Sequence, residues 1–161
     1  MDASLHICKA TPADVGIISR IVERSIRLGC ALDHRNDAQI VANWTHNKSA
    51  EHIQNWLADQ RLHMSVAVLQ DKPIGVGMAA TNGQIAFCYV QPECFRRGAG
   101  QALMHDLEAW LRLQGLPAAR LNSTVASEAF FRRLGYCVSA QTFNVAGLCA
   151  IPMLKTLAPP S

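Results

Sequence analysis

The segment from Tyr89 to Met104 constrains this chain most, because a short apolar strand pattern runs there into a glycine-rich helix start. It reads Tyr-Val-Gln-Pro-Glu-Cys-Phe-Arg-Arg-Gly-Ala-Gly-Gln-Ala-Leu-Met. Glycines let the backbone approach a ligand without a Cβ in the way, and the first N–H groups of a helix have no partner within it. Such a helix start binds anions, and Arg96 and Arg97 can add charge-assisted hydrogen bonds to phosphate oxygens. The segment therefore predicts a pyrophosphate-binding loop.

Spacing separates the phosphate loops to which a Gly-x-Gly could belong. A Walker loop needs Lys and then Ser or Thr after its last glycine, whereas this chain has Gln101 and Ala102. A dinucleotide-binding fingerprint has its first glycine directly after the strand and a third glycine soon after the second. Here Gly98 lies well beyond Val90, and Leu103 stands at the third position. Both patterns fit poorly, and an ordinary helix N-terminus with solvated arginines stays open as the simplest alternative.

Two segments together resemble the GNAT-type N-acetyltransferase superfamily. Val-x-Pro, a short basic loop, Arg-Gly-x-Gly and an apolar helix resemble its coenzyme A pyrophosphate loop. Residues 124–136, Thr-Val-Ala-Ser-Glu-Ala-Phe-Phe-Arg-Arg-Leu-Gly-Tyr, resemble its last helix with the aromatic that follows. The resemblance covers residues 5–156. It implies an α/β (α+β) fold with a mixed, mostly antiparallel sheet of about six to seven strands flanked by helices, in the order β-α-α-β-β-β-α-β-α-β-β.

Hydrophobic periodicity and capping residues predict a similar order of elements, with three helices between the first two strands. Helices are expected from the Thr11-Pro12 cap to Gly29, around 40–44, after Ser49, from the glycine loop to Gly115, and at 126–134. Strands are expected at 5–10, 64–69, 74–80, 85–90, 118–122, 137–145 and 148–156, the last two forming a closing hairpin.

The resemblance implies an enzyme that uses acetyl-coenzyme A and lets a primary amine attack the thioester directly. A noncatalytic acyl-coenzyme A-binding regulatory module is the alternative. The chemistry needs proximity, an N–H group that polarises the thioester carbonyl, and an acceptor for the amine proton. The residues that the resemblance assigns to coenzyme A are Cys88, Tyr89, Val90, Arg96, Arg97, Gly98, Ala99, Gly100, Gln101, Ala102, Asn122 and Phe131.

The chain departs from the family pattern at two catalytic positions. The tyrosine that commonly serves as general acid aligns with Phe131, and the glutamate often found before the loop aligns with Gln84, so neither side chain ionises. Residues 25–34 resemble the segment that overhangs the acceptor site. We therefore predict that His34, oriented by Asp33 or a water, accepts the amine proton, because a histidine of pKa ~6.5 is a base at neutral pH. The alternative is a helix cap with a solvated ring, and we expect Phe131 to pack in the core.

Bulk properties narrow the classes further. A chain of 161 residues, half of them apolar, predicts a single domain over 1–161 with a disordered tail at 156–161. A net charge of +3 without a dense basic run argues against nucleic acid as a partner. No apolar run approaches the ~20 residues of a membrane span and no signal-peptide pattern opens the chain, so we expect a cytoplasmic protein without a membrane partner.

Cysteine and histidine spacing predicts reduced thiols and no metal site. The six cysteines form no C-x-x-C pair, and no H-E-x-x-H motif occurs. Trp44 is spaced as a buried helix face, with a place in the acceptor pocket as the alternative. The identity of the amine acceptor and the oligomeric state stay open, a homodimer being one alternative for the latter.

Overall fold

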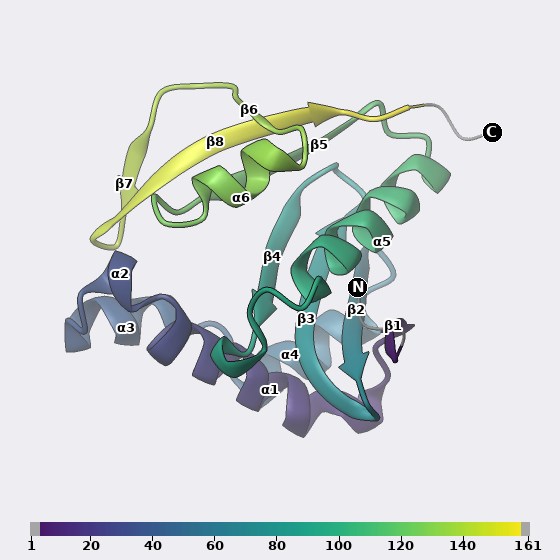
Figure 1. The fold of residues 1–161 in the computed structure, drawn as a ribbon, viewed down its shortest axis with the longest axis horizontal. Helices are drawn as coiled ribbons and strands as arrows, with labels where there is room; N and C mark the ends of the chain where they lie inside the picture. The colour runs from purple at the N-terminus through teal and green to yellow at the C-terminus, as the bar shows by residue number, and fades with distance from the viewer. Residues whose placement is uncertain (1–3, 159–161) are drawn as a thin grey trace.

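The computed structural model describes residues 4–158, which form two antiparallel sheets with helices packed against them (Figure 1). The first sheet has the order β1 (Leu5–Lys9), β2 (Leu62–Leu69), β3 (Lys72–Ala80) and β4 (Ile85–Val90). In the second sheet β8 (Leu148–Thr156) lies between β5 (Ala118–Ser123) and β6 (Cys137–Val138), and it also pairs with β7 (Phe143–Val145). The predicted fold class is confirmed.

The helical elements follow the predicted order, with local departures. In chain order they are the 3-10 turn η1 (Pro12–Asp14), α1 (Val15–Arg24), the π-helical turn η2 (Ser25–Gly29), α2 (Ala31–His34), α3 (Ala38–Thr45), α4 (Ala50–Ala58), the 3-10 turn η3 (Pro92–Cys94), α5 (Ala99–Leu113) and α6 (Glu128–Arg133). The long helix predicted to end at Gly29 does end there, but its last turn is π-helical, and the short helix α2 that follows was not predicted.

The C-terminal region differs from the prediction in two places. The strand predicted at 137–145 is divided into β6 and β7, because residues 140–142, which are polar apart from one alanine, do not pair with β8. The disordered tail predicted from residue 156 is wrong for its first residues, since Thr156 ends β8 and the Leu157 side chain is buried. The Leu157 amide donates to the Pro117 carbonyl at 2.8 Å. Residues 159–161 lie outside the described part.

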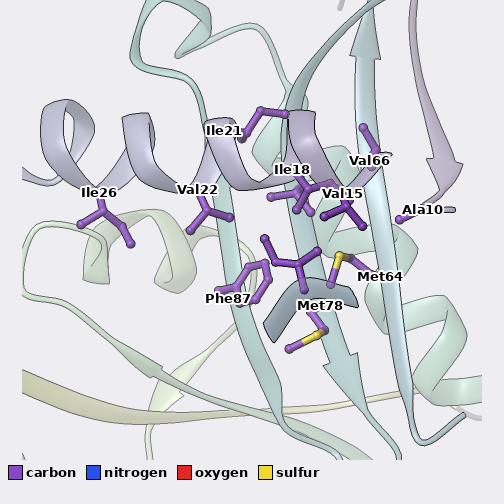
Figure 2. Packing of buried hydrophobic residues seen from close by; sticks show 12 residues of the cluster. Ala10, Val15, Ile18, Ile21, Val22, Ile26, Met64, Val66, Met78 and Phe87 are labelled. Carbon is purple, nitrogen blue, oxygen red and sulfur yellow. The ribbon is translucent and has the colours of Figure 1, made fainter. Parts of the chain in front are cut away.

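Helices cover both faces of the first sheet. On one face α1 presents an apolar stripe, and Ile18, Val22 and Ile26 lie on the side of this helix where Met78 and Phe87 are seen (Figure 2). Ile18 and Ile21 are fully buried, and they belong to a cluster that includes Ile53 of α4 and Phe87 of β4. On the other face α5 packs against β2, β3 and β4. This two-sided burial fixes the strands that carry the candidate site.

Within residues 4–158, the backbones of the two sheets are bridged just before β4 and near the start of β5. Gln84 forms a parallel bridge with Arg120, whose amide donates to the Gly83 carbonyl at 2.9 Å. Over the rest of their described lengths the two strands do not pair, and they diverge into different sheets (Figure 1). The divergence leaves one edge of β4 open, next to the start of α5.

Candidate active site

The open edge of β4 presents unpaired backbone groups. In an antiparallel ladder, alternate residues of a strand bond to the same neighbour. The Gln91 amide donates to the Ile74 carbonyl at 2.8 Å, and the register places Tyr89 opposite Val76, so Tyr89 bonds to β3. By alternation Cys88 and Val90 direct their N–H and C=O groups to the open edge. This conflicts with a coenzyme role for the Tyr89 backbone, whereas the roles of Cys88 and Val90 stay predictions that the geometry supports.

The loop after β4 turns sharply into the N-terminus of α5. Arg96 and Gly98 have positive φ values of 65° and 85°, and Gly98 is the N-cap of the helix. Ala102 donates the first amide hydrogen bond back to the Gly98 carbonyl, at 3.0 Å. The amides of Ala99, Gly100 and Gln101 therefore have no partner within the helix and carry its positive dipole end.

This loop fits the diphosphate of a coenzyme A molecule. Free helix amides, the dipole, and the exposed Arg96 and Arg97 side chains all favour an anion. The positive φ of Gly98 also explains the choice of glycine, because a β-branched residue would be strained there. A substitution such as Gly98→Val would therefore disturb the fold as well as the loop.

The Phe130 side chain, which the sequence did not single out, packs against the start of α5 next to the loop. A Cβ added to Gly100 would lie 3.1 Å from Cζ of Phe130, so the Phe130 ring of α6 is in close contact with the first turn of α5. Phe131 is partly buried, as expected for a core aromatic, with its ring 5.1 Å from that of Phe130 and 6.0 Å from that of Tyr136. Its contact with coenzyme A stays a prediction.

Asn122, also predicted to bind coenzyme A, lies on the other face of β5. Ala119 and Leu121 of this strand pack with residues of α5, so the alternating and exposed Asn122 points away from that helix. The position argues against a direct contact with a molecule bound along α5.

His34 does not have the free nitrogen that a general base needs. The ring is fully buried, its Nδ1 accepts the Asn36 amide at 2.9 Å, and its Nε2 lies 2.7 Å from the Ile26 carbonyl. Because Nδ1 accepts, Nε2 carries the proton and donates it to Ile26. Asp33 does not orient this ring, since its Oδ1 accepts the Ala126 amide at 3.0 Å. The prediction that His34 accepts the amine proton conflicts with these contacts.

Both residues instead hold η2 and α2 in place. The Ile26 carbonyl lies within the π-helical turn, whose hydrogen-bond pattern departs from that of an α-helix, and His34 satisfies it. Asp33 ties α2 to the loop between β5 and α6. The local sequence indicated the helix exit, but only the folded chain shows which backbone groups these side chains reach.

Trp44 and Tyr89 form a hydrogen bond between α3 and the first sheet. The indole Nε1 of Trp44 on α3 donates to the Tyr89 hydroxyl at 3.0 Å, and the Trp44 ring meets His34 edge-on at 6.1 Å. The hydrogen bond thus joins α3 to β4 beside its open edge. The sequence placed Trp44 in the acceptor pocket only as an alternative, and it gave no sign of the contact with Tyr89.

Arg24, at the end of α1, links the helical segment to the glycine loop. Its Nε donates to Gln91 Oε1 at 3.1 Å, and its Nη2 donates to Glu93 Oε1 at 3.0 Å. Glu93 lies in η3, so the loop is braced from the side opposite α5. Sequence reasoning missed Arg24, because no local pattern reports a contact over this separation.

The thiols near the open edge are not nucleophiles. Burial raises the pKa of Cys88 to about 12, and burial together with Asp33 raises the pKa of Cys30 to about 12. The thiolate is the reactive form of cysteine, so both side chains are inert near neutral pH. This agrees with direct attack on a thioester and not with a cysteine-bound intermediate.

Two polar clusters on α5 have structural roles. Buried Glu108 accepts the Tyr136 hydroxyl at 2.7 Å and the Lys155 ammonium at 2.9 Å. Asp106 accepts hydrogen bonds from Ser65 and from His63, the latter at 3.1 Å.

Among residues 4–158 no group of three or more His, Cys, Asp or Glu side chains is placed to hold a metal ion. No helix in this range is both long and apolar enough to cross a bilayer.

Comparison with known proteins agrees with this geometry. The family model described as Acetyltransferase (GNAT) domain matches residues 31–157, most of the chain. The chain belongs to the GNAT acetyltransferase family. The GNAT superfamily predicted from the glycine loop is thus confirmed.

Individual relatives are distant from this GNAT chain. The uncharacterized protein YyaT of Bacillus subtilis strain 168 is 28% identical over 93 residues, which are 55% of this chain and 62% of that protein. The match thus spans less than two thirds of that relative's length.

Solved structures show the same fold over nearly the full length of the chain. A GCN5-related N-acetyltransferase from Rhodopseudomonas palustris superposes with a TM-score of 0.85 at 21% identity, covering 98% of each chain. The PaiA N-acetyltransferase from Thermoplasma acidophilum, solved in complex with coenzyme A, has a TM-score of 0.80 at 16% identity over 95% of this chain and 99% of its own. At such identities these matches establish the fold alone.

Proposed function

We propose that this GNAT protein transfers the acetyl group of acetyl-coenzyme A to a primary amine of a small molecule or a protein. The observation that carries the proposal is the open edge of β4 lying beside the N-terminus of α5. An elongated thioester with a diphosphate can use both features at once. The diphosphate meets the free amides of Ala99, Gly100 and Gln101, and the acyl arm follows the unpaired backbone groups of Cys88 and Val90.

The protein supplies positioning and electrostatics in this reaction. A backbone N–H at the open edge of β4 polarises the thioester carbonyl, and a fixed amide needs no reorganisation when negative charge develops there. The amine attacks the carbonyl carbon, the C–S bond breaks, and the coenzyme thiol takes up a proton that the amine gives up. With His34 bonded to backbone groups, water carries that proton in this proposal.

A noncatalytic acyl-coenzyme A-binding module is the second candidate. The observations that favour it are the engaged nitrogens of His34 and the phenylalanine at position 131, which leave the expected proton-handling positions without an ionisable group. In that case the open edge of β4 and the start of α5 would bind the thioester without turning it over.

Thiol release with acetyl-coenzyme A and a panel of amines separates these candidates. An acetyltransferase releases free thiol only when a suitable amine is present, in step with the acetylated amine detected by mass spectrometry. Binding of acetyl-coenzyme A by calorimetry without amine-dependent thiol release favours the module. Absence of binding contradicts both, and with them the assignment of the loop.

A further inference from the structure

The Tyr89 hydroxyl has a proton left to donate. An indole nitrogen is a donor only, so in the Trp44–Tyr89 hydrogen bond the tyrosine oxygen accepts. No other hydrogen bond of this hydroxyl occurs within residues 4–158. Burial raises the pKa of Tyr89, so the hydroxyl stays protonated near neutral pH. Trp44 therefore holds Tyr89 as a neutral donor whose O–H points away from the indole.

This donor stands on the face of β4 opposite the proposed coenzyme helix. Tyr89 stacks on Phe87 at 5.2 Å, and both pack with the cluster beneath α1, whereas Val90 faces the start of α5. The Tyr89 residue as a whole retains some solvent exposure. When coenzyme A occupies the α5 side, the attacking amine must approach from the face that η2 and α3 border.

The attacking amine itself is a poor partner for this hydroxyl. Its lone pair must point at the thioester carbon, so it cannot also accept a hydrogen bond in the reactive complex. The hydroxyl needs a second acceptor atom on the same molecule. Tyr89 lies directly between Cys88 and Val90, whose backbone groups line the open edge, so its side chain leaves the strand next to the place proposed for the attack.

We propose that Tyr89 is an acceptor-binding residue that selects amines carrying a carbonyl or carboxylate oxygen on the adjacent carbon, as in amino acids, their amides and peptide N-termini. Trp44 is the positioning residue that aims the hydroxyl. This inference rests on the proposed acetyl transfer and specifies its acceptor class. It assigns the Tyr89 side chain to the acceptor, whereas the resemblance assigned Tyr89 to coenzyme A.

The test uses matched pairs of amines that differ in one group. Each amino acid amide is paired with the amine that lacks the carboxamide, for example phenylalaninamide with 2-phenylethylamine and lysinamide with 1,5-diaminopentane. We expect wild-type kcat/KM to favour the amide member by about tenfold or more, the range of a hydrogen bond in a binding site. Tyr89→Phe keeps the ring and removes the hydroxyl, so it should bring the ratio to about 1 through a higher KM for the amide.

Two variants serve as controls. Trp44→Phe should shift the ratio in the same direction by a smaller factor, and the double variant should be no worse than Tyr89→Phe alone. Tyr136→Phe removes the hydroxyl of the other tyrosine, which bonds to Glu108 of α5 and not to Trp44, and should leave the ratio unchanged. The affinity for acetyl-coenzyme A should be the same in wild type and Tyr89→Phe.

Every other outcome contradicts one particular step of the proposal. An equal loss for both members of every pair would mean that the hydroxyl acts on the thioester and not on the acceptor. An unchanged ratio in Tyr89→Phe, or a wild type that acetylates only amines without the oxygen, overturns the selection. A wild type that binds acetyl-coenzyme A yet acetylates no amine refutes the proposed function itself.

Discussion

A charge placed in the first turn of α5 should affect coenzyme binding and protein stability in opposite directions. Gln101 is exposed and is the third residue of the helix, next to the amides that we assign to the diphosphate. Gln101→Glu changes the charge with almost no change in shape. A carboxylate near a helix N-terminus stabilises the helix by about 0.3–1 kcal/mol, so the folded protein should become slightly more stable.

The same carboxylate should repel the diphosphate. At a separation of about 6 Å and an effective dielectric constant of about 40, each pair of like charges costs ~1.4 kcal/mol. The diphosphate of coenzyme A carries two negative charges, which gives ~2.8 kcal/mol and roughly a hundredfold weaker binding. The loss should shrink as salt is added, because the groups are exposed and ions screen them.

Gln114→Glu is the matched control. Gln114 is exposed at the C-terminal end of the same helix, about 20 Å away for 13 residues at ~1.5 Å each, and gives the same change in net charge. Calorimetric titration with coenzyme A at low and high salt, with urea unfolding of each variant, measures both effects. Equal affinities for Gln101→Glu and wild type, or equal losses in the two variants, would refute the placement of the diphosphate at this helix start.

Three further outcomes are expected. Tyr136→Phe leaves one oxygen of buried Glu108 without its donor and should lower the free energy of unfolding in urea by about 1–3 kcal/mol. A hydrogen bond from His63 holds the pKa of the Asp106 carboxyl below its ordinary value. The ionised carboxylate therefore stabilises the folded protein at a pH above that ordinary value, and this stabilisation is lost as the pH falls. Wild type should therefore lose more thermal stability than Asp106→Asn between about pH 5 and pH 3, and parallel curves would contradict this. With the pKa of Cys30 and Cys88 raised to about 12, iodoacetamide at neutral pH should label the exposed cysteines first, which peptide mass spectrometry can check; early labelling of Cys30 or Cys88 would contradict their raised pKa.

Much of this fold follows from local signals in the sequence. The Thr11-Pro12 start, the apolar stripe of α1 and the end at Gly29 depend on nearest neighbours along the chain, and the structure confirms them. The glycine loop is equally local, because free amides and a positive φ at Gly98 follow from a turn into a helix. Such features could be predicted since a few consecutive residues determine their energy.

Only the tertiary structure decided what surrounds the loop. Trp44 and Tyr89 are 45 residues apart, and Asp33 and Ala126 are 93 residues apart, yet each pair shares a hydrogen bond. The sequence indicated His34 as a base because its intrinsic pKa suits that role. Folding instead buried the ring and used both nitrogens on backbone groups. Side-chain chemistry can be read from the sequence, but the availability of a lone pair or a proton depends on neighbours that the folded chain brings together.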